Sequence, residues 1–226
     1  MAAEINSASP TAQVLPYGPA AHLIEVADTA AATALAAALR AAAVVETSAV
    51  KGGLAGRVVD IVPAARTVLV TTDGSPAAAA AVRDAVDSWS PADLADIGGR
   101  LHEIPVIYDG PDLEAVADAT GMASEDVVAA HAGAEYTVAF GGFSPGFCYL
   151  TGLPPVLHLP RRPDPRTEVP TGSVGVAGEF SAVYPRPSPG GWNLIGTAQV
   201  PMWDSSWERP NLLAPGDTVR FVPCQG

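Results

Sequence analysis

The chain of 226 residues is long enough for two domains of about 100 residues each, or for one large domain. Its 48% hydrophobic and 16% charged residues are typical of a globular protein, and no apolar run approaches the roughly 18 residues of a membrane-spanning helix. The net charge of -12 repels phosphate backbones, which argues against a nucleic-acid partner.

The N-terminus and the cysteines together predict a cytoplasmic protein. Residues 1–13, MAAEINSASPTAQ, lack the basic and apolar regions of a secretory signal and are expected to be disordered. The two cysteines, Cys148 and Cys224, are too few for a disulfide framework, so their thiols are expected to be reduced. No histidine is near Cys148 in the sequence, so this residue is expected to fill apolar space rather than act as a nucleophile.

Residues 14–103 are predicted to form one α/β domain. HLIEVA (22–27) predicts a strand, and the alanine-rich segment 28–43 predicts a helix with Asp28 as its N-cap. RVVDIV and RTVLVTTD predict two more strands, and Ser75 followed by Pro76 marks the start of a second helix. LHEIPVIY (101–108) is expected to be the last strand. The order β-α-β-β-α-β is that of a ferredoxin-like domain.

Residues 104–226 are predicted to form a second domain that is rich in β-structure. Two short helices are expected first, in PDLEAVADATG and SEDVVAAHAG, each followed by glycine. Residues 145–200 then contain ten prolines and eight glycines among short β-branched runs. Such a segment is too broken for helices and too apolar for disorder. Short strands with rigid turns favour a small barrel or sandwich.

The segment FGGFSPGFCYLTGLP (140–154) places aromatic side chains around a Ser-Pro-Gly turn. Pro145 fixes its own φ, and Gly146 permits a turn that other residues resist, so the neighbouring rings can be held in fixed directions. The rings concerned are Phe143, Phe147 and Tyr149. They are candidates for the wall of a preformed binding site. The alternative is that they only fill the barrel core.

Positive charge gathers in the same part of the chain. Residues 145–200 carry four arginines and three acids, a net +1, whereas the rest of the chain has eight basic and 21 acidic residues, a net -13. Arg161, Arg162 and Arg166 lie among prolines in LPRRPDPR, and arginine binds carboxylate or phosphate through two parallel hydrogen bonds. Arg162 or Arg166 is the candidate anion clamp. The alternative is ion pairing with nearby acids. Those acids are Asp164, Glu168 or residues of a partner subunit.

SPGGW (188–192) is a further candidate for ligand binding through Ser188, Gly190, Gly191 and Trp192. Its glycines let a ligand approach backbone N–H groups, as in anion-binding nests. The alternative is a tight hairpin beneath the tryptophan ring. TGSVGVAG leaves the same choice for Ser173, whose hydroxyl can bind a ligand or a neighbouring strand. The sequence has no phosphate-binding loop of the G-x-x-x-x-G-K-[ST] type.

Histidine gives one candidate for proton transfer. The four histidines, at 22, 102, 131 and 158, lack metal-ligand spacing, so a metal held by protein side chains alone is not expected. His131 ends the helix SEDVVAAH, where the helix dipole favours the protonated ring. It is a candidate proton shuttle. The alternative is a charged helix terminus without a catalytic role.

Five motifs occur in one order over residues 104–223. They are IPVIYDGPDLEAVADATGM, GFSPGFCYLTGL, PRRPDPRTEVPTGSVGVAG, YPRPSPGGWNLIG and LLAPGDTVRFVP. This pattern resembles the 5-oxoprolinase B subunit, a family also called allophanate hydrolase subunit 1 or KipI-like. The resemblance implies a cyclophilin-like β-barrel domain after the ferredoxin-like one, so an α+β fold is expected. Tyr184, in the fourth motif, joins the candidate binding residues.

The resemblance also implies the small subunit of an ATP-dependent amide or lactam hydrolase. Its expected partners are a larger C subunit, also called allophanate hydrolase subunit 2, and a third subunit of the LamB/YcsF type. Together they would open 5-oxoproline to glutamate, with ATP as cofactor and Mg²⁺ as the counter-ion of the nucleotide. Phosphoryl transfer to a lactam oxygen needs cations and donors that spread charge. The small subunit is expected to be inactive alone.

Two other functions are compatible with the sequence. A relative of the Bacillus type inhibits a sensor histidine kinase, so the chain is alternatively a non-catalytic inhibitor whose aromatic loop grips a kinase helix. Peptidyl-prolyl isomerase activity rests only on analogy with the cyclophilin-like fold.

Overall fold

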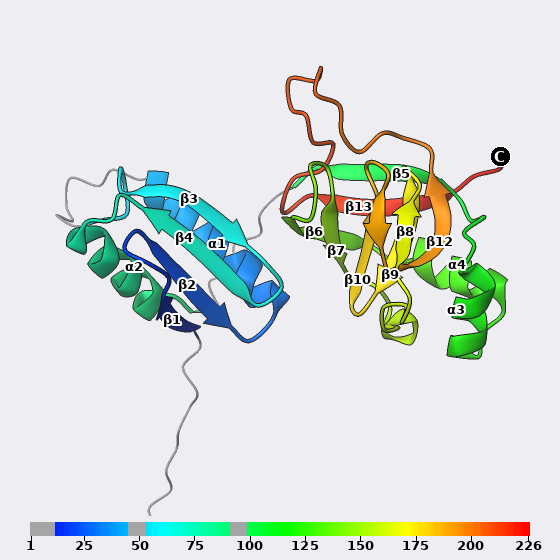
Figure 1. Ribbon diagram of the computed structural model, residues 1–226, viewed down its shortest axis with the longest axis horizontal. Coiled ribbons are helices and arrows are strands. Elements are labelled where there is room, and N and C mark those ends of the chain that lie inside the picture. The colour runs from blue at the N-terminus through cyan, green and yellow to red at the C-terminus, as the bar shows by residue number, and fades with distance from the viewer. Residues whose placement is uncertain (1–11, 45–52, 91–98) are drawn as a thin grey trace, which may run out of the picture. The chain divides into compact units, whose positions relative to one another are not determined.

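The computed structural model describes residues 12–44, 53–90 and 99–226. The chain divides into two compact units, residues 1–97 and 98–226 (Figure 1). The segment predicted to be disordered, 1–13, lies outside the described residues except for its last two, which belong to the first strand. None of the helices in the described ranges is long and apolar enough to cross a membrane.

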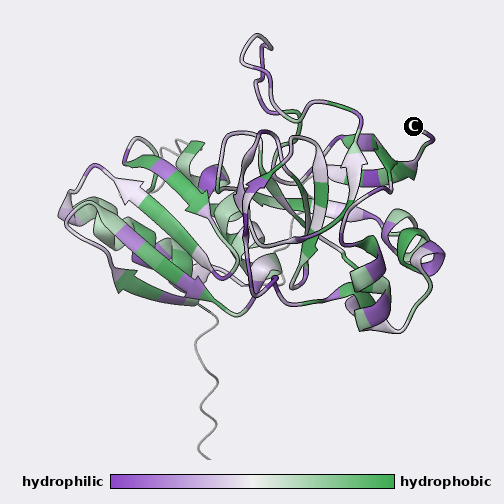
Figure 2. Ribbon diagram, turned by 45° about the vertical axis from the view of Figure 1, so that its right-hand side comes forward, coloured by the Kyte–Doolittle hydropathy of each residue, from purple (hydrophilic) through white to green (hydrophobic). Residues whose placement is uncertain are grey.

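The first unit is a four-stranded sheet with two helices packed against one face. Ile24, Val68 and Val70 point to the helices and are fully buried with Leu35 and Val82. Figure 2 shows that these strands are largely hydrophobic. Along β2 and β4 every second residue is buried, as is typical of a sheet with one buried face. The elements are β1 (Ala12–Pro16), β2 (Ala21–Val26), α1 (Thr29–Val44), β3 (Val58–Pro63), β4 (Thr67–Thr72) and α2 (Pro76–Ser88).

Both predicted N-caps in this unit are confirmed. The Asp28 side chain accepts a hydrogen bond from the Ala31 N–H at 2.8 Å. The Ser75 hydroxyl accepts one from the Ala78 N–H at 3.1 Å, and proline is the first residue of α2. Each bond satisfies a backbone donor that has no partner inside its own helix.

The topology of the first unit differs from the predicted one in a single strand. The strand order is β1-β2-β4-β3, and β1 pairs antiparallel with β2. In the predicted ferredoxin-like order, the strand beside β2 would follow the second helix. Here that place is taken by β1, which precedes β2 in the chain. The unit is therefore a ferredoxin-like sheet whose last strand is supplied from the N-terminal side.

The strand expected to close the first unit belongs to the second one instead. Residues 101–107 form β5, which buries Ile104 and Val106 in the barrel core. The prediction was wrong because alternating apolar residues identify a strand but not the sheet that it joins. The domain boundary predicted near 103 falls inside this strand.

The second unit is a closed barrel of seven strands in the order β10-β7-β6-β13-β5-β12-β9. Its two short helices form where they were predicted, and the expected α+β fold class is confirmed. The elements are β5 (Leu101–Ile107), α3 (Leu113–Thr120), α4 (Ser124–Ala132), β6 (Tyr136–Gly141), β7 (Cys148–Thr151), the 3₁₀-helix η2 (Pro155–Leu157), β8 (Arg166–Val169), β9 (Ser173–Ala177), β10 (Phe180–Val183), β11 (Ser188–Gly190), β12 (Asn193–Ala198) and β13 (Thr218–Pro223).

Two features outside the barrel wall position the site. The short strands β8 and β11 pair with each other in a separate two-stranded sheet. The loop between β12 and β13 projects from the barrel (Figure 1). Inside the wall, Tyr136, Leu150, Ile195 and Phe221 are almost completely buried and form part of one continuous core.

Candidate functional site

A small pocket with a volume of about 60 Å³ lies beside the two-stranded sheet. Its walls are mainly aromatic, with one cation. The lining residues are Phe143, Phe147, Tyr149, Arg161, Tyr184, Pro189, Gly190, Gly191 and Trp192. The sequence predicted eight of these nine as binding residues and missed the proline. The structure thus brings the aromatic segment, the arginine segment and SPGGW to one place.

The aromatic rings of the pocket pack edge to face. The Phe147 ring lies 5.2 Å from the Tyr184 ring and 5.6 Å from the Trp192 ring, at interplanar angles of 78° and 89°. Such pairs have favourable electrostatics and fixed directions. Phe147, Tyr184 and Trp192 are buried in one hydrophobic cluster, and they also line the pocket.

Phe143 forms the exposed edge of the pocket. Its φ is +66°, a left-handed conformation that costs a residue other than glycine about 1 kcal/mol or more. The turn that imposes it is closed by two hydrogen bonds, from the Ser144 N–H to Gly142 O at 2.7 Å and from the Phe147 N–H to Ser144 O at 3.0 Å. The Phe143 ring remains 59% exposed. A strained, exposed aromatic residue beside a pocket is typical of a binding site.

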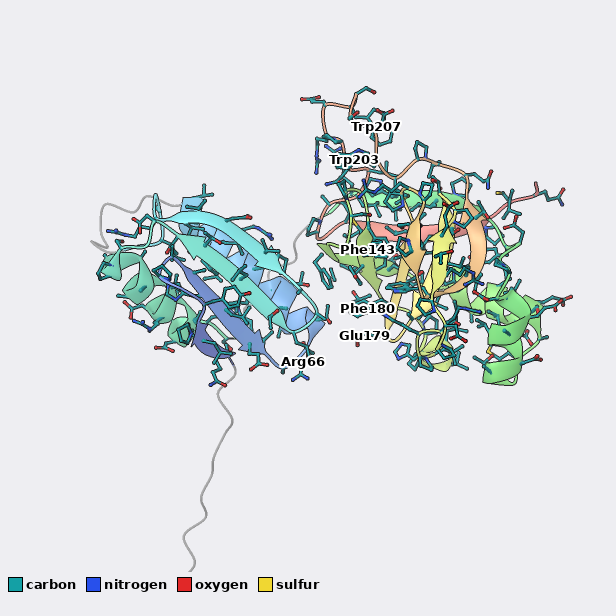
Figure 3. All side chains as sticks on the ribbon, in the orientation of Figure 1. Arg66, Phe143, Glu179, Phe180, Trp203 and Trp207 are labelled. Atoms are coloured by element: carbon teal, nitrogen blue, oxygen red, sulfur yellow. The ribbon has the colours of Figure 1, made fainter. Side chains whose placement is uncertain are left out.

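Gly146 is needed in the same turn for two reasons, although it does not line the pocket. Its φ is +84°, and a Cβ atom at this position would lie 2.6 Å from the Trp203 Cβ. Trp203 belongs to the loop between β12 and β13, and Figure 3 shows it there, with Phe143 at the edge of the barrel. Pro145 also lies in the turn rather than in the wall.

Arg161 is the cation of the pocket. Its side chain lines the wall, and the residue is exposed to solvent. Among the described residues, no carboxylate lies within ion-pairing distance of its guanidinium. Beside apolar rings, a guanidinium attracts an anion more strongly than it does in open water. Arg161 is therefore placed to bind a carboxylate or a phosphoryl group.

Arg162 and Arg166, predicted as the anion clamp, bind an internal acid instead. Arg162 Nη1 donates to Asp112 Oδ1 at 2.6 Å, and Arg166 Nη2 donates to the same oxygen at 2.7 Å. The alternative interpretation was ion pairing with Asp164, Glu168 or acids of a partner subunit. The two arginines do form ion pairs, but with a different acid of this chain. The clamp prediction is corrected because the two guanidiniums already share a buried carboxylate.

Asp112 is the polar residue that sequence reasoning missed. In the sequence it is one residue of the predicted helix segment PDLEAVADATG, but it is 2% exposed and also accepts a hydrogen bond from the Leu194 N–H at 2.7 Å. Burial alone would raise the pKa of Asp112. The hydrogen bonds from Arg166 and Leu194 and the charges of both guanidiniums outweigh burial, so this pKa lies below its usual value. The carboxylate is ionised at neutral pH.

The glycines of SPGGW act through their lack of side chains rather than as an anion-binding nest. Gly190 belongs to β11, and neither it nor Gly191 has the positive φ that such a nest requires. A Cβ on Gly190 would lie 2.5 Å from the Tyr184 hydroxyl oxygen. The barrel hairpin is not found either, because β11 pairs with β8 outside the barrel and not with β12. Ser188 and Ser173 lie on strands and are not among the lining residues.

His131 lies in the barrel core and not in the pocket. It is fully buried, with Nδ1 2.9 Å from the Tyr108 hydroxyl and Nε2 2.9 Å from the Ser181 hydroxyl. Burial lowers the pKa of His131 to about 3. The expectation of a protonated ring at the helix terminus is therefore wrong, because desolvation outweighs the helix dipole.

The remaining sequence expectations concern sulfur and metals. Cys148 is buried, and burial raises the pKa of its thiol to about 11, as expected for a side chain that fills apolar space. Within residues 12–44, 53–90 and 99–226, no three histidine, cysteine or acidic side chains gather as metal ligands.

Comparison with known proteins supports the resemblance seen in the motifs. The chain is 48% identical over 138 residues to the 5-oxoprolinase B subunit of Escherichia coli O157:H7, a match that covers 60% of this chain and 63% of that protein. The chain thus matches less than two thirds of this relative's length. The resemblance to the 5-oxoprolinase B subunit is confirmed.

Two solved structures share the fold. TTHA0988 matches with a TM-score of 0.75 and 35% identity, over 92% of this chain and 40% of that one. The conserved uncharacterized protein PH0987 from Pyrococcus horikoshii matches with a TM-score of 0.54 and 32% identity, over 94% of this chain and 97% of that one. The family model described as carboxyltransferase domain, subdomain C and D, matches residues 12–213. The chain therefore belongs to this family of carboxyltransferase domains.

Proposed function

We propose that the chain is a subunit of an ATP-dependent amide or lactam hydrolase and that its pocket binds the small carbonyl substrate. The observation that carries this proposal is the placement of Arg161, a guanidinium with no ion-pair partner among the described residues, at a rigid aromatic pocket. The similarity to a protein named as a subunit of 5-oxoprolinase points to a lactam that carries a carboxylate.

The chemistry of the pocket fits 5-oxoproline, and its size admits part of the ring. This molecule has a five-membered ring with apolar edges and one carboxylate. The ring would pack against Phe147 and Trp192, and the carboxylate would accept hydrogen bonds from Arg161. A volume of about 60 Å³ is well below the roughly 150 Å³ of a cavity that holds benzene, so the ring would enter only partly. Its carbonyl would then face outward, toward the phosphoryl donor.

The described residues do not fit ATP and Mg²⁺. The pocket is too small for a nucleotide, its glycines form no nest, and the described ranges offer no group of metal ligands. We therefore place the nucleotide on another part of the complex, on the larger subunit or on the third subunit. The role of this chain would be to bind the lactam and fix its direction, which removes much of the entropic barrier to reaction.

The exposure of the pocket supports the need for a partner. Phe143 is more than half exposed, and Arg161 is open to solvent, so the described residues alone do not exclude water from a bound lactam. A phosphorylated intermediate is protected from wasteful hydrolysis only in a closed site. The proposed complex with the larger subunit (allophanate hydrolase subunit 2) and a LamB/YcsF-type subunit would supply that closure, and the isolated chain would be inactive.

The test is ATP-dependent release of glutamate from 5-oxoproline by the reconstituted three-subunit complex. Arg161→Gln removes the charge of the pocket and is expected to lower kcat/KM by roughly 10- to 100-fold, the loss of one charge-assisted interaction. The control is Arg220→Gln, which removes an exposed cation that pairs with Glu135 on the surface. Activity equal to wild type in Arg161→Gln would reject the proposed pocket. Capture of a histidine kinase domain without turnover would favour the inhibitor instead.

A further inference from the structure

Asp112 stands at the N-cap of α3 but does not cap it. The side chain of an N-cap aspartate usually accepts a hydrogen bond from the first turn of its own helix. The Asp112 side chain makes no such bond and turns away from α3. Both of its oxygens are used elsewhere: Oδ1 by Arg162 and Arg166, and Oδ2 by the Leu194 N–H. The residue therefore serves a contact between distant segments rather than its own helix.

Asp112 is itself fixed to the barrel wall. Its N–H donates to Leu194 O at 2.9 Å, while its carboxylate accepts from the Leu194 N–H at 2.7 Å. Gly110 lies so close to β12 that a Cβ there would overlap the Ile195 carbonyl carbon. The segment that carries Asp112 is thus pressed against β12 and bonded to both backbone groups of Leu194.

The segment that receives these bonds, residues 160–166, is the arginine arm. It is fastened along β11 and β12 by Arg162 N–H to Gly191 O at 2.7 Å, by the Asn193 side chain to Pro160 O at 3.1 Å, and by the pairing of Arg166 with Gly190. Arg162 reaches inward to Asp112, whereas its neighbour Arg161 lines the pocket. The inward bond of one arginine therefore fixes the direction of the other.

The charges make Asp112 indispensable to this arrangement. Two guanidiniums meet at one carboxylate oxygen, and Arg162 Nε and Arg166 Nη1 are buried atoms without a hydrogen-bond partner among the described residues. Without the carboxylate, two like charges would face each other in a partly buried site. Removing one charge from such a buried group destabilises a protein far more than the net contribution of the whole group to stability suggests, because the remaining charges are left unpaired. The arm would be expected to move toward solvent.

We propose that Asp112 is a positioning residue that latches the arginine arm to the barrel and thereby aims Arg161 into the pocket. The inference rests on the proposed function insofar as Arg161 binds the substrate. The latch itself rests on the hydrogen bonds of Asp112, which do not depend on the identity of the ligand.

The test compares Asp112→Asn with Asp109→Asn in the full chain. Asp109 is a matched control because it is exposed, lies three residues away, loses the same charge and bonds only the Thr197 hydroxyl among the described residues. Two quantities are measured: the dissociation constant for 5-oxoproline by calorimetry, and the hydrogen exchange rate of the Arg162 amide, which bonds Gly191 and not Asp112. Thermal unfolding of each variant confirms that the fold is retained.

In Asp112→Asn we expect the Arg162 amide to exchange faster. We also expect the dissociation constant to rise roughly 10- to 100-fold, since a misdirected Arg161 would lose its charge-assisted hydrogen bonds to the ligand. Asp109→Asn should match wild type in both. Unchanged exchange and affinity in Asp112→Asn would overturn the latch. If that variant does not fold, Arg162→Gln and Arg166→Gln replace it, because neither side chain lines the pocket and both should still weaken binding. If both bind as wild type, the latch is likewise overturned.

The two proposals fail in different ways. If wild type binds no 5-oxoproline, the proposed substrate is wrong, and the latch is decided by the exchange rate of the Arg162 amide alone. If wild type binds and Asp112→Asn binds equally well, the latch is wrong and the proposed substrate stands.

Discussion

Replacing Gly190 by alanine tests whether the pocket depends on close packing against Tyr184. The new Cβ would lie 2.5 Å from the Tyr184 hydroxyl oxygen and 3.0 Å from two ring carbons. The ring is 1% exposed and packs against Phe147, so it cannot move freely. Because the open space beside this ring is the pocket, we expect the ring either to clash or to shift into the pocket.

Gly191→Ala is the matched control. A Cβ at this neighbouring position would make ordinary contacts, the shortest at 3.5 Å to Pro165, and the backbone has no positive φ. Overpacking a core typically costs 1–3 kcal/mol, whereas alanine in place of glycine at a compatible position stabilises by about 0.4–1 kcal/mol. The two variants should therefore differ by about 1.5–4 kcal/mol in the free energy of unfolding, with Gly190→Ala the less stable.

Urea denaturation followed by tryptophan fluorescence is a suitable assay, because three of the four tryptophans (192, 203 and 207) lie in the barrel unit. Calorimetric titration with 5-oxoproline reports on the pocket. If the Tyr184 ring shifts into the pocket in Gly190→Ala, the difference in the free energy of unfolding should fall at the low end of the range given above, and binding of 5-oxoproline should be lost. Equal stability and equal affinity in the two variants would refute the packing argument.

Two further predictions concern His131 and Phe143. The pKa of His131 is lowered from 6.5 to about 3, so below pH 6.5 the unfolded chain binds a proton that the folded chain does not. The free energy of unfolding should therefore fall as pH drops from about 6.5 toward 3, and it should fall less steeply in His131→Gln. Urea denaturation at several pH values measures this. Phe143→Gly relieves a left-handed backbone but loses an exposed ring, so the free energy of unfolding should stay within about 1 kcal/mol of wild type while the affinity for 5-oxoproline falls. Phe147→Ala truncates a buried ring and should lower the free energy of unfolding by about 3–5 kcal/mol. A flat difference between wild type and His131→Gln across that pH range, or undiminished binding by Phe143→Gly, would contradict them.

The fold was largely predictable because its signals are local. The caps of both helices in the first unit, the two short helices of the barrel unit and the β-rich texture of residues 145–200 all follow from neighbouring residues. The wrong strand, β5, shows the limit of such reasoning. Its alternation of apolar residues was recognised, but its pairing with β12 and β13 depends on segments about 90 to 120 residues away in the chain.

The site was predictable where its residues lie in distinctive motifs, and less so where long-range contacts decide. The aromatic segment and SPGGW could each be named as candidates because proline and glycine mark rigid turns, but their meeting at one pocket depends on the fold. The roles of the three arginines could not be separated, because what distinguishes Arg161 from Arg162 and Arg166 is Asp112, about 50 residues earlier in the chain. An aspartate at a helix start usually caps the helix, so its sequence context concealed this role. The protonation of His131 was also predicted wrongly, because its burial depends on contacts with distant residues, Tyr108 and Phe221.

The most direct test of the account is the affinity of the isolated chain for 5-oxoproline, measured by calorimetry for wild type, Arg161→Gln and Arg220→Gln. We predict that wild type and Arg220→Gln bind equally and that Arg161→Gln binds roughly 10- to 100-fold more weakly. All three should be equally stable, because the Arg161 guanidinium is exposed and forms no ion pair with the described residues. Equal affinity in wild type and Arg161→Gln, or no binding by wild type, would contradict the claim that this pocket receives the substrate.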